Sequence, residues 1–211
     1  MYFSILRTMN LKTPILKILN FIPRPFYGLL SAAVGIAGDI IALSLFPDFN
    51  LSYMISDLGT GPGAIYFNIG TFLSGLFALM AYLHIIEILE NEKSDHPRVF
   101  RIGKAFAINS CLFFALIGVV PSVRSNIILF TIHGGIALIS LVSGVIYLSS
   151  FSYLFFKSEK FKECVGYIPL IAVISIIPFL FSWHPITEWI MTVGVTFWIV
   201  AISIYMIYHK M

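Results

Sequence analysis

Charged residues are scarce in this sequence. Asp, Glu, Lys and Arg make up only 11% of its 211 residues, whereas hydrophobic residues make up 59%. A soluble domain has about 25% charged residues. The mean hydropathy of +0.95 points the same way, so the composition excludes an ordinary soluble domain and predicts an integral membrane protein.

Basic clusters, cysteine motifs and phosphate-binding loops are also missing. The 13 Lys and Arg residues are scattered among apolar segments, so the basic face of a nucleic-acid-binding protein is absent and we expect no nucleic-acid partner. Cys111 and Cys164 form neither a CxxC motif nor a zinc spacing. They are expected in a membrane helix and at a cytoplasmic helix edge, which argues against a structural disulfide. The glycine-rich residues 59–63 lack the Lys-Ser/Thr pair of a phosphate-binding loop.

Long apolar stretches dominate what is present. About 20 predominantly apolar residues are needed to cross roughly 30 Å of hydrocarbon as a helix. Six stretches meet this requirement, and they predict an all-α fold, a six-helix transmembrane bundle that forms a single domain over residues 25–211. The predicted spans are residues 26–46, 65–89, 103–121, 127–149, 165–183 and 189–208.

The first 24 residues are expected to lie outside the bundle on the cytoplasmic side. Lys17 interrupts their only apolar core and no small-residue cleavage site follows, so they do not read as a signal peptide. Two alternatives remain. Residues 15–22 form a short amphipathic segment on the membrane surface, or the segment is a flexible tail.

The distribution of basic residues predicts the orientation. With six spans, 12 of the 13 Lys and Arg residues fall on one side of the membrane and only Arg124 falls on the other. Basic residues in short loops stay on the cytoplasmic side. We therefore expect a multi-pass protein of the plasma membrane with both termini in the cytoplasm.

The connection between the first two spans differs from the rest of the chain. Residues 51–68, LSYMISDLGTGPGAIYFN, are too polar and too rich in glycine to continue a membrane helix. This loop is expected to face outward and to fold over a polar pocket. Ser56 and Asp57 fit a turn or a helix cap, since both side chains bond neighbouring backbone amides; a nucleophilic role for Ser56 is the alternative.

Two ionisable residues lie within predicted spans. Asp39 and His133 each lie on a stripe of small residues, and both are about 10 Å from the outer end of their helix. Ionisable groups at this depth are costly and indicate function. We expect the two side chains to face one another or the same polar cavity; the alternative is a buried pair that only specifies packing.

The outward side of the predicted bundle gathers most of the remaining polar candidates. Asp39, Asp57 and His133 are the candidate catalytic residues. A zinc site, if there is one, would draw its ligands from His133, His184, Asp39 and Asp57, the residue types that zinc prefers. The candidate binding residues are Ser56, Asp57, Asn68, Arg124, His133, His184 and Glu188.

The turn Ile55-Ser56-Asp57-Leu58-Gly59, with Asn68 and Gly75 in the next span and His133 in the fourth, carries a family resemblance. The chain resembles the six-span bacterial and archaeal family called domain of unknown function 998, and it is more distantly similar to the DRAM, FRAG and Sfk membrane proteins. The turn is the one sharp motif. The resemblance implies a fold and a membrane location, but no established activity.

Two function classes remain open. The first is a non-enzymatic membrane protein that binds or organises membrane lipids, or that serves as a subunit of a membrane assembly with a protein partner or a second copy of itself, and it needs no cofactor. The second is an intramembrane hydrolase or lipid-modifying enzyme in which His133, His184 and Asp39 or Asp57 hold zinc and activate water. The absence of an HxxxH pair on a late helix favours the first.

Overall fold

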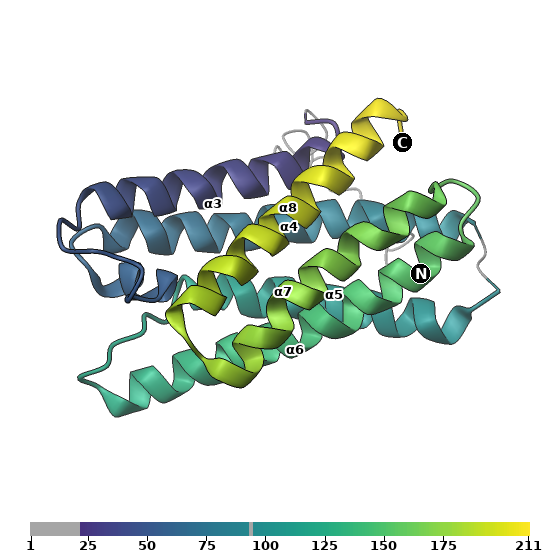
Figure 1. The fold of residues 1–211 in the computed structure, drawn as a ribbon. Helices are drawn as coiled ribbons and strands as arrows, with labels where there is room; N and C mark the ends of the chain where they lie inside the picture. The colour runs from purple at the N-terminus through teal and green to yellow at the C-terminus, as the bar shows by residue number, and fades with distance from the viewer. Residues whose placement is uncertain (1–21, 93–94) are drawn as a thin grey trace, which may run out of the picture.

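The structure is a computed structural model that describes residues 22–92 and 95–211, all helix, turn or irregular chain with no strand in those ranges. Residues 1–21 of the predicted N-terminal segment lie outside the described residues. The described elements, shown in Figure 1, are α3 (Phe26–Ser44), η1 (Ile55–Thr60), α4 (Ala64–Asn91), α5 (Pro97–Ile117), α6 (Ile127–Lys157), η2 (Glu163–Gly166), α7 (Tyr167–Ser182) and α8 (Pro185–Tyr208).

Six of these segments are long and apolar enough to cross a membrane, with η2 and α7 counted as one. The predicted six-helix fold is therefore confirmed, and the chain is a multi-pass membrane protein. Two boundaries differ most from the prediction, the start of α5 and the end of α6. The helix α5 begins at Pro97, because proline suits the first position of a helix, and α6 continues to Lys157, eight residues beyond the predicted end of its span.

The helices are arranged as a ring in chain order. Each one packs mainly against its two neighbours, and α8 closes the ring against α3. The short helix η1 lies at the end of the bundle where α3 and α5 finish, here called the η1 end. The described basic residues other than Arg124 lie toward the opposite end, here called the basic end.

Small residues let neighbouring helices approach closely. Gly38 of α3 lies against Gly70 of α4, so a Cβ atom added at Gly38 would be 2.8 Å from the Tyr66 carbonyl oxygen. Gly75 of α4 lies against Ala115 of α5 in the same way. In membranes, such close backbone contact takes the place of the hydrophobic effect that holds soluble helices together.

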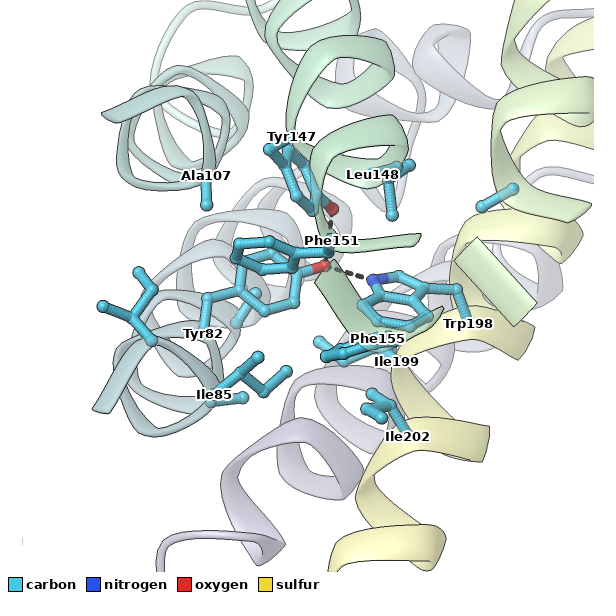
Figure 2. Packing of buried hydrophobic residues seen from close by; sticks show 14 of the residues in the cluster. Tyr82, Ile85, Ala107, Tyr147, Leu148, Phe151, Phe155, Trp198, Ile199 and Ile202 are labelled. Atoms are coloured by element: carbon cyan, nitrogen blue, oxygen red, sulfur yellow. Dashed lines mark hydrogen bonds between the residues drawn. The ribbon is translucent and has the colours of Figure 1, made fainter. Parts of the chain in front are cut away.

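An aromatic cluster fills the centre of the ring (Figure 2). The Tyr147 hydroxyl donates to the Tyr82 hydroxyl at 2.7 Å, and the Trp198 indole N–H donates to the same oxygen at 3.0 Å. These three side chains come from α6, α4 and α8 and are at most 3% exposed. One shared hydroxyl oxygen therefore ties together three alternate helices of the ring.

Candidate functional site

The helix η1 is a short turn, and its face toward α3 and α4 is apolar. The Met54 N–H donates to Asp57 Oδ2 at 3.0 Å, which starts the turn as a cap. Ile55 and Leu58 are buried against Phe67 and Ala42. Hydrocarbon side chains therefore pack against this face of η1. That a polar pocket lies under the turn stays a prediction.

Asp57 is held by Arg124, which lies in the connection between α5 and α6. Asp57 Oδ1 accepts hydrogen bonds from Arg124 Nε and Nη2 at 3.2 and 2.9 Å, and Oδ2 accepts from Nη2 at 2.8 Å. The Asp57 side chain is 10% exposed, and the Arg124 side chain is 62% exposed. With the Met54 bond included, the carboxylate accepts four hydrogen bonds, so it serves to fix the guanidinium in place.

Glu188 holds η1 from the side of α8. It lies in the first turn of α8 and is 7% exposed. Its carboxyl group lies close to the backbone N–H groups of Ile55 and Ser56 and to the Ser56 hydroxyl. The other carboxyl oxygen, Oε2, is buried without a hydrogen bond. The next residue in the sequence, Trp189, donates its indole N–H to the Tyr53 carbonyl oxygen at 3.3 Å.

Asn68 connects η1 to α4. Its Nδ2 donates to the Gly59 carbonyl oxygen at 3.2 Å, while its Oδ1 is buried without a partner. Gly59 has no room for a side chain here, because an added Cβ would be 2.8 Å from that Oδ1 atom. The turn is thus fastened from three directions, by α4, by α8 and by the connection that carries Arg124.

His133 supports the connection between α5 and α6, which also carries Arg124. It is buried on α6, and its Nδ1 lies 2.6 Å from the Val120 carbonyl oxygen. Because a carbonyl oxygen only accepts, Nδ1 carries the proton and donates. Val120 precedes Arg124 by four residues, so His133 helps to position the chain that presents the guanidinium.

The predicted direct pairing of Asp39 with His133 is wrong. The helix α3 packs against α4 and α8, whereas α6 packs against α5 and α7, and no ion pair joins the two residues. The prediction treated equal depth as proximity, but the ring order separates the two helices. That the two residues share a cavity stays a prediction.

His184 caps α8. It is exposed, and its Nδ1 accepts from the Ile186 N–H at 3.3 Å. The four candidate zinc ligands therefore have separate surroundings: Asp57 binds Arg124, His133 binds a carbonyl group, His184 caps a helix and Asp39 lies on α3. Within residues 22–92 and 95–211, no three His, Cys, Asp or Glu side chains are grouped to hold a metal ion.

A shallow groove lies between α4 and α5 beside η1. Its volume is about 450 Å³. At its floor the end of α5 packs closely against α4. A Cβ added at Gly118 would be only 2.4 Å from the Asn68 carbonyl oxygen. Ile65 and Val119 on its walls are 63% and 57% exposed, so the groove opens sideways. It is lined by Ile65, Asn68, Ile69, Phe72, Gly118 and Val119.

The structure thus brings most of the predicted binding residues to the η1 end, in three contacts: Ser56 with Glu188, Asp57 with Arg124, and Asn68 with Gly59. Sequence reasoning missed the groove and the Tyr82–Tyr147–Trp198 cluster. The signal for the cluster was present, since tyrosines well inside a span are unusual and need polar partners.

Comparisons with known proteins give no relative. No family model, no curated protein and no solved structure matches the chain.

Proposed function

We propose that this protein binds and organises membrane lipid without chemical turnover, holding a phospholipid with its phosphate at Arg124 and one acyl chain in the α4/α5 groove. The observation that supports this most strongly is the exposed Arg124 guanidinium, fixed by the buried Asp57 carboxylate. In this proposal the η1 end faces outward, both termini are cytoplasmic, and the membrane is the plasma membrane.

The way Arg124 is bound leaves part of it available. Nε and Nη2 donate to Asp57, and no hydrogen bond from Nη1 is found within the described ranges. The second edge of the planar guanidinium, which includes Nη1, matches the geometry of a phosphate. Because Asp57 already restricts the side chain, less conformational entropy is lost when a phosphate binds.

The groove gives the acyl chain a place at the same end of the bundle as this cation, since Val119 of its wall and Arg124 lie in the same connection. Its walls are mainly aliphatic and aromatic, and it opens sideways, where hydrocarbon surrounds a membrane protein. Asn68 joins the two parts of the site, because it lines the groove and also bonds the turn that carries Asp57. A lipid here would have its headgroup at the bundle end and its chain alongside α4.

The resemblance to the domain of unknown function 998 family stays a prediction, and it adds a membrane location but no activity. A subunit role with a protein partner or a second copy remains the other form of the non-enzymatic hypothesis. The lipid proposal differs from it because it requires a specific response to phosphate and acyl chain.

The test is a thermal-unfolding titration of the purified protein in detergent. We expect phosphatidylglycerol to raise the unfolding temperature more than diacylglycerol, which has the same chains but no phosphate. A ligand at 100 times its Kd stabilises a protein by about 2.7 kcal/mol. Replacing Arg124 by Gln removes the phosphate partner, and Val119→Trp fills the groove while leaving the ion pair in place; both should reduce the shift.

The matched control is Ile128→Trp, which adds the same bulk at an exposed position on α6 near the same end, outside the groove. It should leave the lipid response unchanged. Equal stabilisation by both lipids, or an equal loss with Val119→Trp and Ile128→Trp, would overturn the proposal.

A further inference from the structure

Asp39 is an acidic side chain inside a membrane span, and it has no polar partner in the part of the chain that the structure describes. It lies on α3, five residues before Ser44, which ends the helix, so it is about 8 Å from the η1 end of α3. Among residues 22–92 and 95–211, Asp39 forms no hydrogen bond or ion pair. An ionisable group at such depth normally pairs with another group, since leaving it unpaired in hydrocarbon is costly.

The position of Asp39 on α3 is on the side toward α8. Gly28 and Ala32 precede it by eleven and seven residues, which places all three on one face of the helix. At Gly28, α8 comes very close, with Ser203 and Ile199 as the nearest neighbours. Asp39 therefore lies on the same face of α3 that α8 covers near Gly28, but closer to the η1 end.

The two helices do not stay together along this face. Figure 1 shows α8 running obliquely across the bundle, with its C-terminal part near the start of α3. At the other end of α8, Trp189 contacts Phe49 and Tyr53 of the connection after α3. At the η1 end α8 therefore contacts the connection, and within the described residues no hydrogen bond or ion pair joins Asp39 to α8.

The α3 surface next to Asp39 is suited to another helix. Ile36 and Ile40 are 43% and 59% exposed, and Ala33 and Ala37 are exposed as well. Small and aliphatic side chains allow close packing of membrane helices, and a polar group among them adds specificity. Asp39 is the one acidic residue of α3.

The charge identifies the kind of partner. A second copy of this chain offers no matching cation among its described residues: Arg124 is bound to Asp57, and the other Lys and Arg residues lie toward the basic end. A lipid amine would remain at headgroup level, about 8 Å from the depth of Asp39. A basic residue on a membrane-spanning helix of another protein can lie at the depth of Asp39, so such a helix fits the charge.

We propose that Asp39, with Ile36 and Ile40, forms a docking face for a membrane-spanning helix of another protein that carries a Lys or Arg about 8 Å inside the corresponding end. The basic side chain pairs with the Asp39 carboxylate, and the rest of the helix packs on the exposed side of α3. This inference is independent of the lipid site at Arg124.

The test uses a defined probe. Synthetic 23-residue Leu/Ala helices, each with a fluorophore, are reconstituted with labelled full-length protein in phosphatidylcholine vesicles, and association is measured by energy transfer. One peptide carries Lys six residues from the end that matches the η1 end, a second carries Lys at its centre, and a third carries Leu at both positions.

We expect the first peptide to associate at least about tenfold more tightly than the other two, and Asp39→Asn to abolish the difference. Asp39→Lys should then select a peptide with Glu at the same position. Ser44→Asn, an exposed polar position on the same helix, is the control and should change nothing.

Equal association of all three peptides with the wild-type protein would overturn the proposal. So would a preference for Lys that survives in Asp39→Asn. If phosphatidylethanolamine in the vesicles displaced the Lys peptide completely, the carboxylate would be a lipid site and the partner-helix proposal would fail. Circular dichroism and gel filtration of each variant confirm that it is folded.

Discussion

Arg124 and Asp57 are 67 residues apart in sequence, yet three hydrogen bonds of 2.8 to 3.2 Å join their side chains at the η1 end of the bundle. The pair links the connection between α5 and α6 to the turn between α3 and α4. One partner is buried and the other is exposed, so the interaction both fastens the turn and presents a fixed positive charge.

Replacing Asp57 by Asn should release η1 locally. The variant loses the charge that binds Arg124, and hydrogen bonds to charged groups contribute about 1.5–3 kcal/mol; exposure of Arg124 favours the lower value. Hydrogen exchange of residues 52–63 should become faster while the central helices stay protected. The control Asp48→Asn changes an exposed acid of the same connection and should have no effect; equal exchange in both variants would contradict the fastening role.

The shared hydroxyl of Tyr82 predicts an order of stabilities. Tyr82→Phe leaves the Tyr147 hydroxyl and the Trp198 N–H without their acceptor, whereas Tyr147→Phe removes only one donor. Hydrogen bonds between membrane helices contribute about 0.6 kcal/mol on average and up to about 1.7. Thermal unfolding in detergent should therefore show a larger loss for Tyr82→Phe, and the reverse order would mean that Tyr82 is not the common acceptor.

Two glycines should respond oppositely to alanine. At Gly75 the new Cβ would lie 2.7 to 2.9 Å from Ala115, including its backbone, and overpacking of this kind costs about 1–3 kcal/mol. At Gly134 nothing lies within 4 Å, so Gly134→Ala should be neutral or stabilising by up to about 1 kcal/mol through helix propensity. Denaturation of the two variants tests the α4/α5 contact directly.

The predicted orientation is open to a labelling experiment with a natural probe. Cys164 is exposed near the basic end and Cys111 is buried, so Cys164 alone should react with a membrane-impermeant maleimide. It should do so only after the cells are permeabilised. Leu51→Cys, exposed in the connection after α3, should react in intact cells; labelling of Cys164 without permeabilisation would reverse the orientation.

Much of the fold followed from the sequence, because the need to bury a helix in hydrocarbon leaves a clear pattern. All six spans were predicted within several residues. At the start of α5, charge was wrongly taken to mean loop: Arg98 and Arg101 lie in the first turns of that helix. Such long side chains extend from a helix end into water, so charge marks the membrane boundary better than it marks the helix boundary.

The sequence pointed to residues that gather at η1, but not to their contacts. Residue type and a place on the outward side singled out Asp57, Arg124 and Glu188, and all three lie at η1; that they form a binding site stays a prediction. The pairing of Asp39 with His133 failed because the order of helices around a ring depends on contacts such as Gly28 with Ser203, which no local pattern reveals. The groove at Gly118 was missed for the same reason.

The most direct measurement of the lipid site is photo-crosslinking with a phosphatidylglycerol that carries a diazirine in one acyl chain. After irradiation of the reconstituted protein, mass spectrometry should place the main adducts on Ile65, Ile69, Phe72 and Val119, and Arg124→Gln should weaken them. Adducts spread evenly over other exposed positions, such as Ile174 and Val193, would contradict the account.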